Sequence, residues 1–165
     1  MKNSVFSLLI LLLLIITIPS KSQNNNVRES VKYINALLKE NPYLDSFQEI
    51  TFYYSIDILT DNELIIKMEL DGPFKTLYRS KISDLDPVAQ NNPAMIASTY
   101  ICWNCKSTET KENNSCVINE TVYEGGNKEV HTSGNICVMF SNENNVYDKL
   151  FDEFDHLFNE CKGNK

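Results

Sequence analysis

The sequence predicts an α+β domain in which two helices flank an antiparallel sheet. Two amphipathic helical repeats lie near the N-terminus and at the C-terminus, over 27–38 and 142–161. Between them, about six segments alternate apolar with polar residues, which is the pattern of half-buried strands. No internal repeat or flexible linker interrupts the chain, so we expect one globular domain over 23–165.

Residues 1–22 are a separate targeting segment. Lys2 supplies a positive charge, an apolar run covers 5–18, and Pro19 ends this run. The arrangement is typical of a secretory signal peptide and predicts cleavage between Ser22 and Gln23. The run is shorter than the roughly twenty apolar residues that a spanning helix needs, so we expect no membrane span in the mature chain.

The mature chain is acidic. The full sequence carries 15 basic and 22 acidic residues, for a net charge of −7. Loss of two lysines with the signal peptide makes this −9, from 13 basic and 22 acidic residues. Binding to nucleic acid or to an anionic membrane surface needs clustered lysine and arginine, which the sequence lacks. We therefore expect neither as a partner.

The first helical repeat has its apolar residues at α-helical spacing. Asn26 and Glu29 fit a capping box at the start of this helix, and Asn41-Pro42 ends it. The apolar face consists of Val27, Val31, Ile34, Leu37 and Leu38.

The next part of the chain changes to the two-residue period of a strand. Thr60-Asp61-Asn62 and Asp71-Gly72-Pro73 are turn sequences that divide it. A turn over 83–87 closes this first sheet, and we expect a polar loop without periodicity over 87–93. The predicted strands are 48–58, 64–70 and 74–81.

Three further strands are predicted over 95–105, 116–123 and 129–140. The turn Glu124-Gly125-Gly126-Asn127 separates the last two. We expect consecutive strands to pair as hairpins, so that 116–123 lies between the other two.

The C-terminal helix has one apolar and one polar face. Ser141 or Asn142 can cap its start, and the negative charge of Glu143 interacts favourably with the positive end of the helix dipole. Gly163 is expected in the left-handed conformation beyond the end of the helix. The apolar face consists of Val146, Leu150, Phe151, Phe154, Leu157, Phe158 and Cys161. Burial of this face should make the helix a principal part of the core.

Five cysteines in an exported chain predict disulfide bonds in an oxidising compartment. In the expected hairpin, Cys105 lies opposite Cys116 and Trp103 opposite Ile118. A shift by one residue would expose Trp103, so we predict a structural Cys105–Cys116 bridge. Cys161 is a competing thiol for either partner.

The same register places Cys102 and Cys137 on the other side of the sheet, where they are not expected to be neighbours. These two cysteines are the remaining competing thiols. The second hairpin aligns Val122 with Val130. This hairpin places on the apolar side of the sheet the residues Ile136, Val138 and Phe140.

Two other uses of the cysteines are less favoured. Cys102-Trp103-Asn104-Cys105 has the spacing of a thioredoxin-like redox motif, but adjacent strand residues point to opposite faces and a redox pair belongs at a helix N-terminus. A zinc site built from Cys102, Cys105, Cys116 and His131 lacks a second closely spaced ligand pair. We therefore expect no metal and no cofactor.

No catalytic motif is present. His131 and His156 fall on the outer strand face and on the polar helix face, where solvated side chains are expected. The carboxylate pairs Asp84 with Asp86 and Glu69 with Asp71 are typical of turns. Two glycosylation sequons begin at Asn113 and Asn119.

The order of strands closed by a C-terminal amphipathic helix resembles a pleckstrin-homology-like (PH-like) domain. Ser83-Asp84-Leu85-Asp86-Pro87 and Tyr147-Asp148-Lys149-Leu150-Phe151-Asp152-Glu153-Phe154 resemble segments of small exported bacterial proteins of unknown function. The resemblance implies a strongly bent antiparallel sheet, or a partly open barrel, of about six to seven strands with an added N-terminal helix. It implies a binding scaffold, and the basic loop that phosphoinositides require is absent.

These observations favour a non-enzymatic exported domain that binds a protein or peptide, in the periplasm, at the cell surface or outside the cell. The alternatives are a thiol-disulfide redox protein that uses Cys102 and Cys105, and an inhibitor or structural subunit of a surface assembly.

Processing of the signal peptide gives a first prediction. N-terminal analysis of the exported protein should find Gln23 as its first residue, because small residues precede the predicted cleavage point. Recovery of an intact Met1 from the membrane fraction would contradict this.

Overall fold

The structure is a computed structural model that describes residues 18–59, 62–70, 75–86, 89–91, 98–106 and 115–163. Most of the predicted signal peptide lies outside these ranges. Within them, none of the helices combines the length and the apolar character needed to cross a membrane.

The described residues form two α-helices, α2 (Ile18–Glu40) and α3 (Val146–Lys162), with two short 3-10 turns, η1 (Ile82–Asp84) and η2 (Glu143–Asn145). The strands are β1 (Tyr43–Asp45), β2 (Ile50–Ile58), β3 (Glu63–Leu70), β4 (Lys75–Lys81), β5 (Gln90–Asn91), β6 (Ser98–Asn104), β7 (Val117–Val122), β8 (Lys128–Ser133) and β9 (Asn135–Ser141). The protein therefore has the predicted α+β fold.

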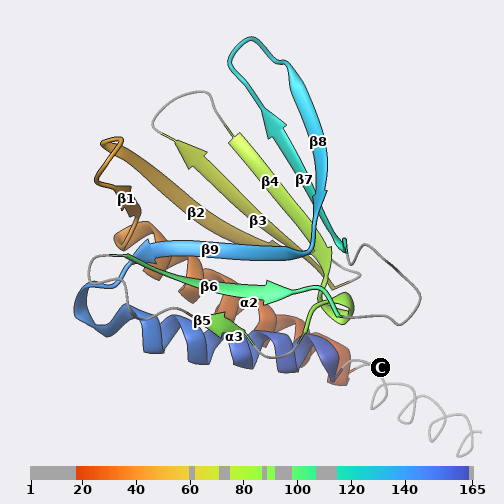
Figure 1. The fold of residues 1–165 in the computed structure, drawn as a ribbon. Coiled ribbons are helices and arrows are strands. Elements are labelled where there is room, and N and C mark those ends of the chain that lie inside the picture. The colour runs from red at the N-terminus through yellow and green to blue at the C-terminus, as the bar shows by residue number, and fades with distance from the viewer. Residues whose placement is uncertain are drawn as a thin grey trace, which may run out of the picture.

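The strands form two antiparallel sheets rather than one. The larger sheet has the order β1-β2-β3-β4-β7-β8, and the smaller has the order β5-β6-β9. Figure 1 shows the strands of the larger sheet fanning out behind β9, with α2 and α3 beneath both sheets. In the described part of the chain the larger sheet ends at β1 and β8, so it does not close into a barrel.

The predicted single strand over 129–140 is wrong, because the chain changes sheet within it. β8 pairs with β7 in the larger sheet, whereas β9 pairs with β6 in the smaller one. A bend at Gly134 separates the two strands, and β9 leaves at a large angle to β8 (Figure 1).

The predicted hairpin between 95–105 and 116–123 is also wrong. β7 returns to the larger sheet beside β4, where Arg79 lies opposite Ile118. Trp103 instead lies opposite Ile136 on β9. Ile118 and Val130, which were expected on the apolar side, are exposed, and Val122 lies opposite Lys128 rather than Val130.

The first hairpin follows its predicted alternation. β2 and β3 pair through Ile56 opposite Ile66, and both side chains are buried on the face that we call the core face. Tyr53 and Asp57, three residues before and one residue after Ile56, are exposed on the outer face. The period of two therefore placed the correct face of this hairpin toward the core.

Two short strands were not predicted from the sequence. β1 pairs with β2 through Tyr43 opposite Phe52, and β5 lies in the expected loop over 87–93, with Gln90 opposite Cys102. Strands of two or three residues are too short to show a repeat in the sequence.

Helix α2 begins earlier than the capping pattern at Asn26 indicated. The described helix extends from Ile18 through the predicted cleavage point at Gln23. Along the apolar face of α2, Ile34 and Leu38 are almost completely buried, as the sequence predicted.

Helix α3 supplies the centre of the core, as predicted. The Trp103 ring of β6 lies between two of its side chains, with ring centroids 4.8 Å from Phe154 and 5.0 Å from Phe158. The predicted cap at Ser141 or Asn142 is wrong, because Asn145 precedes the first residue of α3 and makes no side-chain capping hydrogen bond. Asn142 lies before η2, and its Oδ1 accepts a hydrogen bond from the Tyr147 N–H at 3.0 Å. The left-handed conformation expected at Gly163 is not found, because its φ is −66°.

Phe154 provides a test of this core. Phe154→Ala should lower the free energy of unfolding by about 3–5 kcal/mol, because it leaves a cavity against Trp103. Phe47→Ala is a matched control at an exposed position and should change it by less than about 0.5 kcal/mol. Denaturant unfolding of both variants measures the difference, and equal losses would contradict the assignment of the core.

Candidate binding surface

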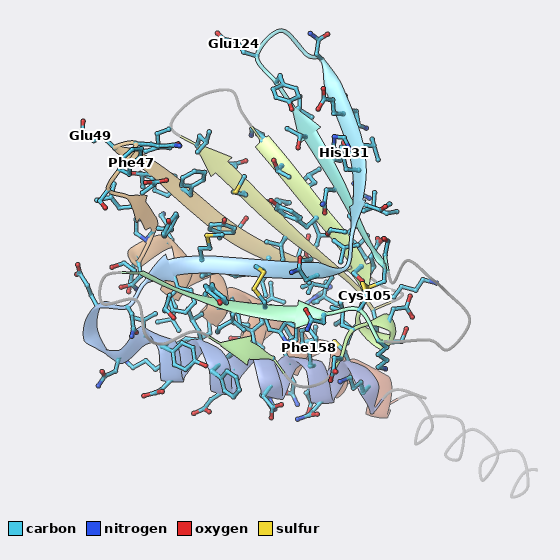
Figure 2. The ribbon with its side chains drawn as sticks, viewed as in Figure 1. Phe47, Glu49, Cys105, Glu124, His131 and Phe158 are labelled. Atoms are coloured by element: carbon cyan, nitrogen blue, oxygen red, sulfur yellow. A yellow bond between two sulfur atoms is a disulfide. The ribbon has the colours of Figure 1, made fainter. Side chains whose placement is uncertain are left out.

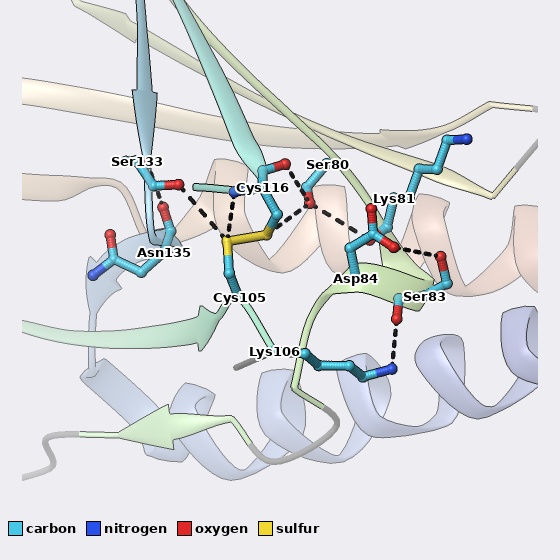
Figure 3. Close-up of a disulfide and its surroundings, with 9 residues drawn as sticks. All are labelled: Ser80, Lys81, Ser83, Asp84, Cys105, Lys106, Cys116, Ser133 and Asn135. Carbon is cyan, nitrogen blue, oxygen red and sulfur yellow. Dashed lines mark hydrogen bonds between the residues drawn. A yellow bond between two sulfur atoms is a disulfide. The ribbon is translucent and has the colours of Figure 1, made fainter. Parts of the chain in front are cut away.

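The first bridge joins the two sheets where they meet. Cys105 follows the end of β6, Cys116 precedes β7, and their S–S distance is 2.03 Å. The Cys116 N–H donates to Cys105 Sγ at 2.9 Å, and Ser80 Oγ donates to the Cys116 carbonyl at 3.1 Å. The Cys105 N–H donates to the Gly134 carbonyl at 2.7 Å, so the bond lies at the corner between β8 and β9 (Figure 3).

This is the cysteine pair that the sequence predicted, but the argument behind the prediction fails. Cys105 and Cys116 are not opposite each other in a hairpin, since β6 and β7 belong to different sheets. The corner brings them together with a Cα–Cα distance of 5.6 Å. The bond therefore connects two sheets rather than two strands of one sheet.

The second bridge contradicts the expected register. Cys102 and Cys137 lie directly opposite each other on β6 and β9, with Cα atoms 4.1 Å apart and sulfurs 2.04 Å apart. They were not expected to be neighbours, because the hairpin prediction paired the strand of Cys102 with that of Cys116. A pair of directly opposed strand residues has a spacing that suits a disulfide.

The two bridges leave no Cys-x-x-Cys disulfide, because Cys102 and Cys105 bond to different partners. His131 is exposed on β8, where its Nε2 lies 3.5 Å from Glu129 Oε2. In the described ranges no three cysteine, histidine or acidic side chains are grouped closely enough to hold a metal ion. The zinc ligands that the sequence suggested are thus not assembled there.

Cys161 is the free cysteine of the described chain. It lies on the buried face of α3, and burial together with nearby Glu160 raises the pKa of its thiol to about 11. Its backbone carbonyl accepts a hydrogen bond from Asn62 Nδ2 at 2.9 Å, which joins the end of α3 to the β2–β3 turn. The thiol is therefore both covered and protonated at neutral pH.

A group of tyrosines lies on the core face, with Tyr54 in the hydrophobic core and Tyr43 and Tyr78 packed against it. Tyr54 Oη donates to Met68 Sδ at 3.2 Å, and the Tyr43 ring is 5.6 Å from the Phe52 ring. Burial raises the pKa of Tyr54, and the neighbouring Tyr78 and Tyr43 raise it further. Its hydroxyl stays protonated at neutral pH, which fits packing rather than acid–base chemistry.

The remaining polar groups suggested by the sequence are dispersed. The Asp84 carboxylate accepts a hydrogen bond from Ser83 Oγ at 3.0 Å within η1. His156 is exposed on α3. Asn119 is half-buried on β7, and Thr121 of its sequon shares a hydrogen bond with Thr76 at 3.2 Å. Asn113 and Asp71 lie outside the described residues.

The most unusual surface feature is the tip of the β1–β2 hairpin. Phe47 is 94% exposed there, the highest value for a large apolar side chain of the described residues. Figure 2 shows Phe47 and Glu49 at this tip, on the side of the molecule away from Cys105 and Phe158. An aromatic ring in this position is available to contact another molecule, and aromatic residues are frequent anchors in protein interfaces.

The tip has a defined backbone conformation. Asp45 Oδ1 accepts hydrogen bonds from the N–H groups of Phe47 at 2.9 Å and Gln48 at 3.2 Å. Glu49 completes the turn with a φ of +56°, a left-handed conformation that costs a residue other than glycine about 1–2 kcal/mol. The turn thus presents Phe47 from an ordered loop that contains a strained residue.

We use the name hairpin tip for Leu44, Asp45, Phe47, Glu49 and Tyr53. Leu44 and Tyr53 are diagonal neighbours on the outer face of β1 and β2, and both are exposed. Asp45 and Glu49 add two negative charges beside Phe47. The hairpin tip is therefore an apolar projection with an acidic border.

The sequence reasoning missed the hairpin tip because β1 has only three residues. Asp45-Ser46 is a turn sequence, and an aromatic residue at the next position is unusual in a turn. These two signals mark a turn that carries an aromatic residue, but they do not show that the turn is ordered.

The cysteine pairing gives a second structural prediction. Non-reducing peptide mapping should find Cys102 joined to Cys137 and Cys105 joined to Cys116. Cys161 should react with iodoacetamide at pH 8 only after denaturation, because it is buried and its pKa is raised. Rapid labelling of Cys161 in the native protein, or a bond from Cys105 to Cys161, would contradict the structure.

The hairpin tip is thus an ordered, convex apolar surface suited to insertion into a pocket of another molecule. Comparisons of the chain with known protein families, with curated proteins and with solved structures found no match.

Proposed function

We propose that this protein is an exported, non-enzymatic binding domain and that the hairpin tip contacts its protein or peptide partner. The exposure of Phe47 on an ordered turn carries the proposal. The side chain makes little contact with its own chain, so its burial by a partner would gain most of the free energy of removing an aromatic ring from water.

The order of the turn strengthens this reading. A partner that binds a flexible loop must offset the entropy lost when the loop becomes ordered. The two hydrogen bonds of Asp45 already order the backbone at Phe47 and Gln48. The acidic border favours a partner pocket that is apolar inside and carries lysine or arginine at its rim.

The rest of the molecule serves as a scaffold in this proposal. Both disulfide bonds lie within the sheets or at their corner and support a location in an oxidising compartment, in line with the predicted signal peptide. The antiparallel strands followed by the C-terminal helix α3 support the PH-like scaffold as the finer description of the fold. An inhibitor or a subunit of a surface assembly would use the same anchor.

Phe47→Ser tests the proposal. The wild-type chain, expressed in full with a tag, is recovered with its partners from native envelope and secreted fractions, and the partners are identified by mass. The dissociation constant of each purified partner is then measured by calorimetry. Phe47→Ser should weaken binding at least about tenfold, because it removes the anchor but keeps the N–H that donates to Asp45.

Tyr33→Ser is the matched control, because Tyr33 is also an exposed aromatic residue but belongs to α2 rather than to β1 or β2. It should leave the dissociation constant unchanged. A partner that binds both variants like the wild type would rule out the hairpin tip. Reduction of insulin disulfides by the purified protein, at a rate lost on Cys102→Ser or Cys105→Ser, would instead support the redox alternative.

A further inference from the structure

Strand β8 forms an open edge of the larger sheet. It has β7 on one side, and no described strand pairs with its other side. All its side chains except that of Ser133 are exposed. An edge of this kind presents free N–H and C=O groups to any strand that can align with it.

The outward-facing backbone groups of β8 can be identified from its hairpin with β7. The Tyr123 N–H donates to the Asn127 carbonyl at 2.9 Å, so this pair is hydrogen-bonded. Bonded and non-bonded pairs alternate along an antiparallel ladder, which turns residues 129, 131 and 133 toward β7. Lys128, Val130 and Thr132 therefore direct their N–H and C=O groups to the open edge.

We propose that β8 pairs with β8 of a second copy of this chain, antiparallel and with the twofold axis at Val130. In this register Val130 lies opposite its own copy, and Lys128 lies opposite Thr132 of the other copy. Each of these pairs exchanges two N–H···O bonds, so every outward-facing group of the strand finds a partner. The two larger sheets become one continuous sheet.

The side chains favour the same register. A twofold axis at residue 129 would place two Glu129 carboxylates opposite each other, and an axis at residue 131 would place two His131 rings opposite each other. Both alternatives also leave outward-facing backbone groups unpaired. With the axis at Val130, Glu129 instead lies opposite His131 of the other copy, which avoids a like-charge pair.

The outer face adds an apolar contact along the axis. Val130 is 58% exposed and Ile118, its diagonal neighbour on β7, is 47% exposed. Pairing about Val130 brings Val130 and Ile118 of both copies together on the outer face, where each copy covers part of the apolar surface of the other. The opposite edge of the sheet is less suitable, because β1 has three residues and lies against β9.

Sedimentation velocity tests the pairing. The secreted product of the full chain should pass from monomer to dimer between concentrations on the order of 1 and 100 µM, the range expected of a small interface. Val130→Lys should remain monomeric throughout, because it places two ammonium groups at the axis without changing a buried residue. Its far-ultraviolet circular dichroism should match that of the wild type.

Leu44→Lys is the matched control at the other edge strand, because Leu44 is 56% exposed. It should dimerise like the wild type, and so should Phe47→Ser, which separates this inference from the proposed function. A wild-type protein that stays monomeric at the highest concentration would overturn the proposal, as would a dimer that survives Val130→Lys but not Leu44→Lys.

Amide hydrogen exchange provides a second measurement on the wild type. Protection of the Lys128, Val130 and Thr132 amides should increase with protein concentration, whereas the amides at 129, 131 and 133 should be protected at every concentration. Concentration-independent exchange at the first three amides would show that the strand edges do not meet.

Discussion

The architecture depends on one change of direction, at which the chain leaves the larger sheet after β8 and enters the smaller sheet as β9. Both strands are short and regular, and only Gly134 lies between them. The corner sets the two sheets at a large angle, so their inner faces, with α2 and α3, enclose a single apolar cluster. The Cys105–Cys116 bond and the Gly134 carbonyl hold this same corner from the β6 and β7 side.

The hairpin tip and β8 lie at opposite edges of the larger sheet, because β1 and β8 are the two ends of its strand order. Two copies joined through β8 would carry their hairpin tips at the two far ends of one continuous sheet. A partner with two pockets at that separation would then bind more tightly than either tip alone allows.

Much of this fold is readable from the sequence. The helical repeats identified the buried faces of α2 and α3, and the period of two assigned Ile56 and Ile66 to the core, because each pattern reflects burial along a single element. The partners of each strand were less predictable. The turn Gly125-Gly126 identified the β7–β8 hairpin, whereas the glycine that moves the chain between sheets resembles any other loop residue.

The hairpin tip was the part least visible in the sequence. Hydrophobic periodicity detects residues that must be buried in the monomer, and Phe47 lies in a four-residue turn where no period can be measured. The order of the turn depends on the geometry of Asp45 and Glu49, which composition does not reveal. The pairing of Cys102 with Cys137 was hidden for a related reason, since it follows from the position of β9 rather than from any local pattern.

The odd cysteine has a consequence for how the chain matures. Cys161 is the last of the five cysteines in the sequence and follows Cys137 by 24 positions (161 − 137), so in a chain exported N-terminus first, as we propose, it would reach the oxidant after the other four. In the folded protein its thiol is covered and holds its proton, which disfavours exchange with either bridge. Docking of α3 would thereby also end thiol exchange, and chains in which α3 has not docked would remain open to correction of wrongly paired sulfurs.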